Sequence, residues 1–224
     1  MERRAIPASL ALALVLSALS PSAPANAAPV ARPAAWATAV SRTSVGNLYR
    51  VEPDLFRSAQ PSSAGFRELE ALGIKSVLDV AGGDGDKEAA RGTGLKLLHV
   101  PMTAWGLRDG PVLEALRVLR DARNRPLIIH CQHGADRTGA IVALYRVVVQ
   151  GWTKEDAVRE MNEGGFHHSS FWKNLDRYVL DTDVEVLRRK LGIVVPAAPS
   201  PSQALVAGAS TVSNAAAAPV AANE

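Results

Sequence analysis

One cysteine and one arginine, six positions apart, are the residues in this 224-residue chain whose types and spacing could do chemistry. They lie in the stretch L-I-I-H-C-Q-H-G-A-D-R-T-G, from Leu127 to Gly139. Cys131 offers a sulfur nucleophile, and Arg137 offers a planar guanidinium that matches two oxygens of a phosphate. The chain therefore carries a nucleophile and an anion clamp within one turn of backbone.

The segments on either side of this stretch predict how the two residues are positioned. The apolar run 127–129 predicts a buried strand, and the apolar-rich segment 140–149 predicts a helix that ends at Gly151. In a strand–loop–helix unit the backbone N–H groups of the loop converge at the positive end of the helix dipole, which favours a bound anion. A cysteine in that field is expected to be largely thiolate near neutral pH.

The segment from His130 to Gly139 resembles the active-site loop of the cysteine-dependent protein tyrosine phosphatases, especially their small dual-specificity branch. The resemblance rests on Cys-x5-Arg followed by Thr-Gly, with Gly134 in mid-loop. The segment N-L-Y-R-V-E-P-D-L-F-R-S-A-Q, residues 47–60, is similar to the opening of bacterial dual-specificity-type phosphatases. The resemblance covers roughly residues 43–190. With the alternation of strands and helices, it implies an α/β fold with a central, mostly parallel sheet flanked by helices.

The resemblance implies hydrolysis of a phosphomonoester through a phosphocysteine intermediate, with Cys131 as nucleophile. Thr138 would donate its hydroxyl to the departing sulfur, while His130 and Gly139 would support the loop. No metal or other cofactor is expected, because the loop itself supplies the positive potential. The residues expected to hold the phosphate are Gln132, His133, Gly134, Ala135, Asp136 and Arg137.

Two aspartates compete as the proton donor to the leaving group. In the resembling family the donor comes from the loop before a preceding helix, where Asp109 is the only acid between Met102 and Pro111. Asp109 could instead cap that helix. Asp136 makes the loop read C-x-x-G-x-D-R-T-G, which looks like the loop of myotubularin-type and bacterial lipid or triple-specificity phosphatases, where a loop acid has been proposed as donor. Both assignments remain open.

The N-terminus has the pattern of a secretory signal peptide. Arg3 and Arg4 precede an apolar stretch from residue 8 to 19, and the small residues at 25–27 predict cleavage after Ala27. Export to the periplasm or outside the cell is therefore expected. An uncleaved membrane anchor is the competing interpretation, but the apolar stretch is short for a bilayer, so no stable membrane insertion is expected once the signal is removed.

Composition suggests one folded domain between two low-complexity segments. We expect a flexible lead-in at 28–42, a phosphatase domain at 43–192 and a disordered Ala/Pro/Ser tail at 193–224. Removing residues 1–27 lowers the formal net charge from +3 to +2, too little to indicate a nucleic-acid partner. Cys131 is the only cysteine, so the fold must be stable without a disulfide. The oligomeric state is not predicted.

Several expected elements lie around the loop. A helix beginning at Ser62 or Ser63 should carry Phe66, Leu69 and Leu72 on one apolar face, and a single last helix should run from about residue 170 to Lys190. Most of the remaining polar residues have two interpretations. Arg57 and Gln60 are expected near the cleft, with a solvated surface charge as the alternative for Arg57. His167 and His168 suggest either a metal or, more simply, packing or a pocket rim.

The substrate is less constrained than the reaction. No lysine run stands in the loop, which favours a phosphorylated protein or small phosphoester over inositol phosphates or phospholipids. The sequence thus favours a protein tyrosine or dual-specificity phosphatase. It leaves open an inositol phosphate or phospholipid phosphatase on the same loop, an exported phosphate-binding module without turnover, and a rhodanese-like sulfur transferase.

Overall fold

The structure, a computed structural model, describes residues 32–83 and 85–194. The expected signal peptide at 1–27 and nearly all of the expected tail at 193–224 lie outside these residues, so both stay predictions. Within the described part of the chain, no helix combines the length and the apolarity that crossing a bilayer requires.

A six-stranded sheet forms the centre of the domain, with strand order β1-β2-β3-β6-β4-β5. The pairings of β3 with β6, β6 with β4 and β4 with β5 are parallel, whereas β1–β2 and β2–β3 are antiparallel. The mostly parallel sheet expected from the sequence is therefore confirmed. The strands are β1 Thr38–Ala39, β2 Tyr49–Glu52, β3 Leu55–Ala59, β4 Ser76–Asp79, β5 Lys96–His99 and β6 Leu127–Cys131.

Strand β6 lies between β3 and β4 and ends at the nucleophile. Cys131 pairs with Ala59 of β3, and His130 pairs with Ser58 of β3 and Asp79 of β4. All five residues of β6 are buried. Open α/β sheets bind ligands at the carboxyl ends of their strands, and the fold brings Cys131 to such an edge.

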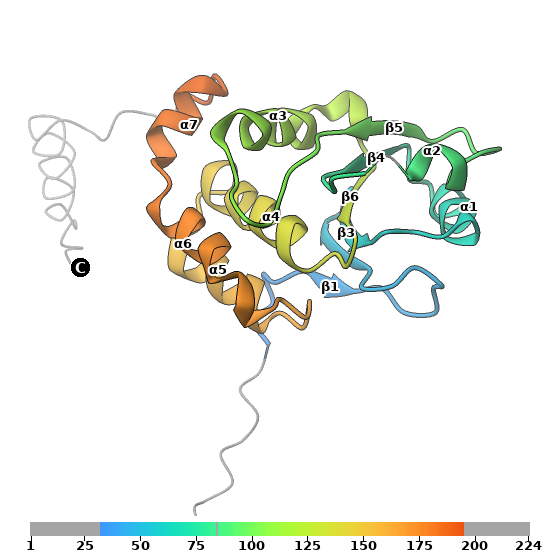
Figure 1. Cartoon of the computed structure of the whole chain (residues 1–224), viewed down its shortest axis with the longest axis horizontal. Helices are drawn as coiled ribbons and strands as arrows, with labels where there is room; N and C mark the ends of the chain where they lie inside the picture. The colour runs from blue at the N-terminus through green and yellow to red at the C-terminus, as the bar shows by residue number, and fades with distance from the viewer. Residues whose placement is uncertain (1–31, 84, 195–224) are drawn as a thin grey trace, which may run out of the picture. The chain divides into compact units, whose positions relative to one another are not determined.

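Helices cover both faces of the sheet, as Figure 1 shows. Helices α1 and α2 lie on one side, and α3 to α7 lie on the other. Neighbouring residues of β6 point to opposite faces: Ile128 packs in the cluster with Phe66 of α1, and Ile129 packs in the cluster with Leu116 of α3. The α-helices are α1 Ser63–Ala71, α2 Asp86–Ala89, α3 Asp109–Arg120, α4 Asp136–Val148, α5 Lys154–Glu163, α6 Lys173–Asp181 and α7 Val184–Lys190; the 3-10 turns are η1 Ala122–Asn124 and η2 Ser170–Trp172.

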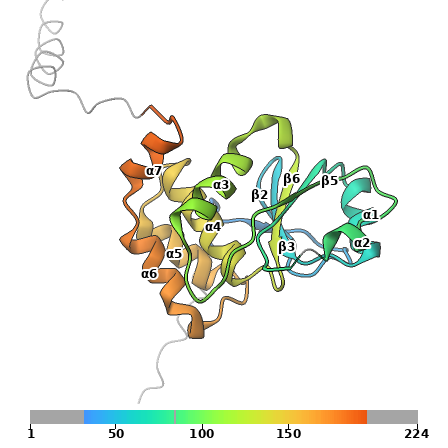
Figure 2. The ribbon, with the colours of Figure 1, turned by 45° about the horizontal axis from the view of Figure 1, so that its top comes forward.

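Helix α4, which follows the loop, is surrounded by other helices. Every residue from Thr138 to Val148 is buried, as expected for a helix that is apolar on nearly all sides. Helices α3, α5, α6 and α7 all contact it, and Figure 2 shows it among them. Because α4 is held on so many sides, the N-terminus that it presents to the loop has a fixed direction.

The folded domain begins earlier than the sequence indicated. Strand β1 pairs with β2, and Trp36 and Ala37 are buried, so the flexible lead-in expected at 28–42 is corrected from Pro33 onward. The backbone N–H of Ala37 donates to Glu160 Oε1 at 2.6 Å. The alanine- and proline-rich composition hid this contact, because its partner lies in α5, far along the chain.

Two helix expectations also need correction. Leu72 is 55% exposed, because it is the C-cap of α1, where the chain turns through Gly73 at a φ of +84° and leaves the apolar face. The single last helix is in fact two, α6 and α7. Asp183 restarts the helix as an N-cap, accepting a hydrogen bond from the Val186 N–H at 3.0 Å.

Candidate active site

The first half of the loop after β6 is held from behind through its carbonyl groups. The carbonyl oxygen of Gln132 accepts a hydrogen bond from the Gln60 N–H at 3.2 Å. The carbonyl oxygen of His133 accepts one from Asn47 Nδ2 at 3.0 Å. Both donors come from the segment 47–60, which is similar to the opening of bacterial phosphatases. These hydrogen bonds give that segment a structural role, which is to hold the loop.

The second half of the loop is held in the same way. The carbonyl oxygen of Gly134 accepts from Arg57 Nη2 at 2.7 Å. The carbonyl oxygen of Ala135 accepts from the Gly139 N–H at 2.9 Å and from Arg57 Nη2 at 3.4 Å. Four consecutive carbonyl groups of the loop thus accept hydrogen bonds from other residues of the domain.

This arrangement determines where the loop amides point. In a trans peptide the C=O of one residue and the N–H of the next point in opposite directions. The amides of residues 133–136 therefore face away from the donors that hold the carbonyls. On the open side of the loop, at the N-terminus of α4, these amides would form the phosphate-binding cradle that the sequence predicts. The buried Cys131 lies at the start of this cradle.

Gly134 is the loop residue that the geometry restricts most. Its φ is +67°, a conformation that side chains disfavour. A Cβ built there would lie 2.2 Å from the carbonyl oxygen of Ser58, far inside van der Waals contact. The glycine lets the loop pack directly on the end of β3.

Arg57 is a buried positioning residue beneath the loop. It is only 1% exposed, its guanidinium carbon lies 3.7 Å from the centre of the Phe166 ring, and its Nε has no hydrogen-bond partner among the described residues. Burial lowers the pKa of Arg57 from its ordinary value to about 10, and the negative charges of Glu160 and Cys131 oppose that shift. Arg57 thus stays charged at neutral pH and adds positive potential under the nucleophile. The cleft-side interpretation of Arg57 is confirmed.

His130 forms a buried polar cluster at the other side of β6. Its Nε2 lies 2.8 Å from Asp86 Oδ2, and its Nδ1 lies 3.8 Å from Asp79 Oδ1. Asp86 Oδ1 in turn accepts from Gln60 Nε2 at 3.2 Å. Burial raises the pKa of Asp79. This cluster fixes the end of β6, which agrees with the expected supporting role of His130; nothing in the geometry presents it to a substrate as a base.

Two residues at the start of α4 were expected to assist the reaction. Arg137 Nη1 donates to the carbonyl oxygen of Met102 at 3.3 Å, so its side chain connects the loop to the segment after β5. Thr138 is fully buried, and its Oγ1 has no hydrogen-bond partner within the part of the chain that the structure describes. A buried hydroxyl without a partner needs an explanation, and a hydrogen bond to the sulfur of Cys131 during the reaction would supply one. Both catalytic roles stay predictions.

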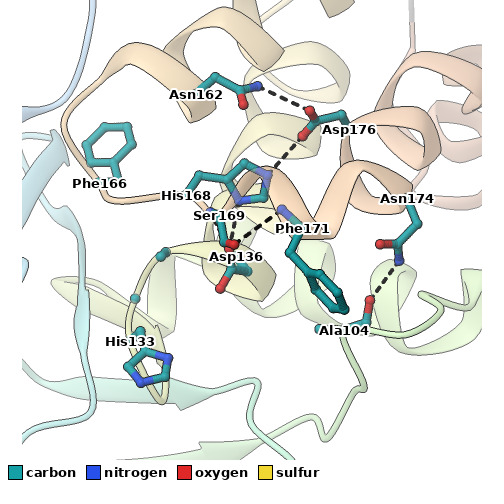
Figure 3. Close-up of polar contacts among 12 residues, drawn as sticks. Ala104, His133, Asp136, Asn162, Phe166, His168, Ser169, Phe171, Asn174 and Asp176 are labelled. Carbon is teal, nitrogen blue, oxygen red and sulfur yellow. Dashed lines mark hydrogen bonds and ion pairs between the residues drawn. The ribbon is translucent and has the colours of Figure 1, made fainter.

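Asp136 is part of a half-buried triad with His168 and Asp176, drawn in Figure 3. Its Oδ1 accepts from the Ser169 N–H at 3.0 Å and lies 2.8 Å from His168 Nδ1, although at an angle too poor for a good hydrogen bond. His168 Nε2 lies 3.0 Å from Asp176 Oδ1, and the imidazole is fully buried. Of the two interpretations of His168, packing near the site is the one its contacts support. The triad ties the loop to the segment before α6.

Asp109 does not belong to this triad. It is in the first turn of α3 but is not its cap, since Arg108 occupies that position and no side chain caps the helix. Asp109 Oδ1 accepts from the Tyr178 hydroxyl at 2.7 Å. Burial, together with this hydrogen bond, raises the pKa of Tyr178. The two candidate proton donors are therefore engaged with different partners, and neither is seen to face a substrate.

Comparison with known proteins adds independent information. A family model described as "DSP-PTPase phosphatase fused to NAD+ Kinase" matches residues 25–174. The chain is 40% identical over 182 residues to the dual specificity protein phosphatase TpbA of Pseudomonas aeruginosa, which covers 80% of this chain and 82% of the relative. It is 30% identical over 161 residues to the inositol diphosphatase DSP5 of Arabidopsis thaliana, covering 66% of this chain and 76% of that protein.

Solved structures agree with these relatives. A crystal structure of a Cys-to-Ser variant of TpbA in complex with pTyr superposes with a TM-score of 0.66 at 38% identity, covering 72% of this chain and 99% of that one. The Siw14 catalytic core has a TM-score of 0.59 at 22% identity, covering 67% and 93%, and supports the fold alone.

Proposed function

The chain belongs to the DSP-PTPase family of cysteine-dependent protein phosphatases, and from this membership we propose that its substrate is phosphotyrosine in proteins. The family accounts for the reaction, a phosphomonoester hydrolysis, and disfavours a sulfur transferase or a non-catalytic module. TpbA has been crystallised with pTyr, which supports the same substrate here by similarity.

The observation that carries the proposal is that both candidate acids among the described residues already accept hydrogen bonds from the protein. Residues 101–108, the segment that contacts Arg137, contain no carboxylate. Asp136 Oδ1 accepts from the Ser169 N–H, and Asp109 Oδ1 accepts from the Tyr178 hydroxyl. A tyrosine phenolate, with an ordinary pKa near 10, can leave with little help from an acid. The alkoxide of serine or threonine is far more basic and needs a proton as it departs. Such a site therefore favours aryl over alkyl phosphates.

The reaction would take two steps. The Cys131 thiolate attacks phosphorus in line, an S–P bond forms, and the P–O bond to the tyrosine breaks. The amides of residues 133–136 and the guanidinium of Arg137 stabilise the equatorial oxygens as charge shifts. Water then attacks phosphorus and loses a proton to solvent, the S–P bond breaks, and the Thr138 hydroxyl donates a hydrogen bond to the sulfur, which leaves as a thiolate. The phenolate released in the first step takes its proton from solvent, so the products are tyrosine and inorganic phosphate.

We place this activity outside the cytoplasm. The basic, apolar and small-residue pattern of residues 1–27 supports export, and a single unpaired cysteine in an exported chain is best explained by catalytic use. An alkaline-phosphatase fusion to residues 1–40 should be active only if export occurs. A cytoplasmic fusion product would reject this localisation.

A diphosphoinositol substrate is the second candidate, because inositol diphosphatases are among the relatives. Polyanionic inositol phosphates need several cationic contacts, and the exposed loop residues Gln132 and His133 supply no permanent positive charge. Phosphotyrosine is therefore a better candidate substrate than a diphosphoinositol.

A substrate panel tests the proposal. Wild type and Cys131→Ser are assayed on phosphotyrosyl, phosphoseryl and phosphothreonyl peptides of one sequence and on a diphosphoinositol. We expect kcat/KM on phosphotyrosine to exceed that on phosphoserine by about 100-fold or more, and Cys131→Ser to be inactive on all. A higher kcat/KM on the diphosphoinositol than on the phosphotyrosyl peptide would overturn the substrate assignment.

A further inference from the structure

Three aromatic side chains form an exposed cluster beside the catalytic loop. Trp105 and Phe171 are 75% and 68% exposed, and Trp172 lies half-buried beneath them. The ring centre of Trp172 is 4.9 Å from those of both Trp105 and Phe171, and all three pairs meet edge to face. We call these three residues the aromatic cluster. Exposed apolar groups gathered in one place, rather than scattered singly, indicate a binding surface.

The cluster is rigid, because it is built on anchored segments. Trp172 packs against the main hydrophobic core, and its backbone N–H donates to the carbonyl oxygen of Ser169 at 2.9 Å. Asn174 Nδ2 bridges the two segments by donating to the carbonyl oxygens of Ala104 at 2.7 Å and Trp105 at 3.3 Å. Figure 3 shows the Phe171 ring directed toward Ala104. The two segments therefore present one platform.

Both segments are also tied to the catalytic loop. The first contains Met102, whose carbonyl oxygen accepts from Arg137, and Trp105 is three residues further on. The second contains Ser169, whose N–H donates to Asp136, and Phe171 is two residues further on. With about 3.8 Å between consecutive Cα atoms, the Cα atoms of Phe171 and Trp105 lie within about 8–11 Å of those of Ser169 and Met102, the residues that contact the loop. Residues one to three positions from a bound phosphotyrosine in an extended peptide lie about 3–10 Å away.

We propose that the aromatic cluster binds an aromatic or long aliphatic side chain that flanks phosphotyrosine in the substrate protein. The inference rests on the proposed function and extends it, since it names a sequence preference around the phosphorylated residue. The occupant belongs to the substrate because the cluster is continuous with the catalytic loop, through Arg137 on one side and Asp136 on the other. The phosphotyrosine ring itself must lie over the cradle, so the cluster is left for a neighbouring residue.

Peptide kinetics test this inference. A set of phosphotyrosyl peptides carries alanine at every flanking position or phenylalanine at one of them. In wild type at least one phenylalanine position should raise kcat/KM about tenfold over the all-alanine peptide, mainly through a lower KM. In Trp105→Ala/Phe171→Ala that ratio should fall to near one, whatever the absolute turnover. Phe171→Ala alone, which leaves the Trp172 packing in place, should give an intermediate ratio.

Leu72→Ala is the matched control, because Leu72 is an exposed apolar residue at the C-cap of α1, and Figure 1 shows α1 on the other side of the sheet from α6. It should keep the wild-type ratio. A wild-type ratio near one, or a ratio that survives in the double variant, overturns the inference while the proposed function stands. If p-nitrophenyl phosphate is hydrolysed but no phosphotyrosyl peptide is, the proposed function fails and the inference with it. A wild-type dimer that the double variant dissociates would make the cluster a self-association surface and also overturn the inference.

Discussion

At the scale of single residues, the proposed chemistry depends on groups that hold the loop from beneath. Arg57 is the clearest case: a charged side chain, nearly completely buried, whose Nη2 holds the carbonyl oxygens of Gly134 and Ala135. Burying a charge costs free energy, and the lowered pKa of Arg57 reflects that cost. Its hydrogen bonds to the loop and the contact with Phe166 offset part of it.

Arg57→Met should therefore separate activity from stability. The free energy of unfolding should change by less than about 2 kcal/mol, because the removed desolvation cost offsets the lost hydrogen bonds. The value of kcat/KM should fall about 100-fold, since small displacements of a catalytic loop cost that much. Urea unfolding and p-nitrophenyl phosphate kinetics measure the two effects. Arg50→Met, an exposed arginine over the Phe56 ring on the neighbouring strand, is the control and should change neither. Wild-type turnover in Arg57→Met would refute the positioning role.

Asp136 offers a second test at this scale. Its Oδ1 is held by the Ser169 N–H and lies beside His168, so we expect it to act as a clamp rather than as the proton donor. Asp136→Asn should lower kcat/KM on a phosphotyrosyl peptide about tenfold and leave the shape of the pH–rate profile as it is in wild type. Asp109→Asn should also keep the wild-type shape. A basic limb that is present in wild type and lost in one variant would identify that aspartate as the general acid.

At the scale of elements, the strand–loop–helix unit is what the protein needs for catalysis. Strand β6 delivers Cys131 to the edge of the sheet, and α4 points its N-terminus at the phosphate position. Between them, Gly134 lets the loop contact the end of β3. The unit can position Cys131 only while the loop keeps this one conformation.

Gly134→Ala should destroy that shape. The added Cβ would overlap the carbonyl oxygen of Ser58, and the φ of +67° would be strained as well. We expect at least a ~1000-fold loss of kcat/KM and a loss of about 2–4 kcal/mol in the free energy of unfolding. Gly82→Ala is the control, since a Cβ there meets no atom within 4 Å. Near-normal activity of Gly134→Ala would show that the loop is far more adaptable than the contacts indicate.

This unit is also the part that sequence could predict. The apolar run, the glycine and the spacing of Cys131 and Arg137 are local, so one stretch of chain carries the whole pattern. The supports are not local: Arg57 is 77 residues from Gly134, and Asn47 is 86 residues from His133. A single sequence does not say which distant residues meet. For the same reason His168, the partner of Asp136, could be placed near a pocket rim but not matched to its acid.

At the scale of the whole molecule, the N-terminal segment, residues 33–42, packs on the side of the domain away from α1 and α2. Ala37 donates to Glu160, which also forms a buried pair with Arg146, so the residue before β1 is joined to α4 and α5. Removing the segment would expose that pair and remove the buried Trp36 side chain. The helix that carries the loop is thus held partly by residues that composition alone had assigned to a linker.

Truncation tests this role. A chain beginning at residue 28 should fold and be active, whereas a chain beginning at residue 43 should lose about 3 kcal/mol or more of its free energy of unfolding, from lost apolar burial and a lost charged hydrogen bond. Urea unfolding followed by circular dichroism gives both values. If the two chains are equally stable, the domain begins at residue 43, as the sequence predicted.

The central claim is that the sulfur of Cys131, held at the mouth of a cradle of amides, carries the phosphoryl group. Rapid quench of turnover on a phosphotyrosyl peptide with denaturant at neutral pH, followed by mass spectrometry of the digested enzyme, tests it most directly. We predict one phosphoryl group on the peptide that contains Cys131 in wild type and none in Cys131→Ser. A phosphoryl group on His130 or His133, or turnover by Cys131→Ser, would contradict it.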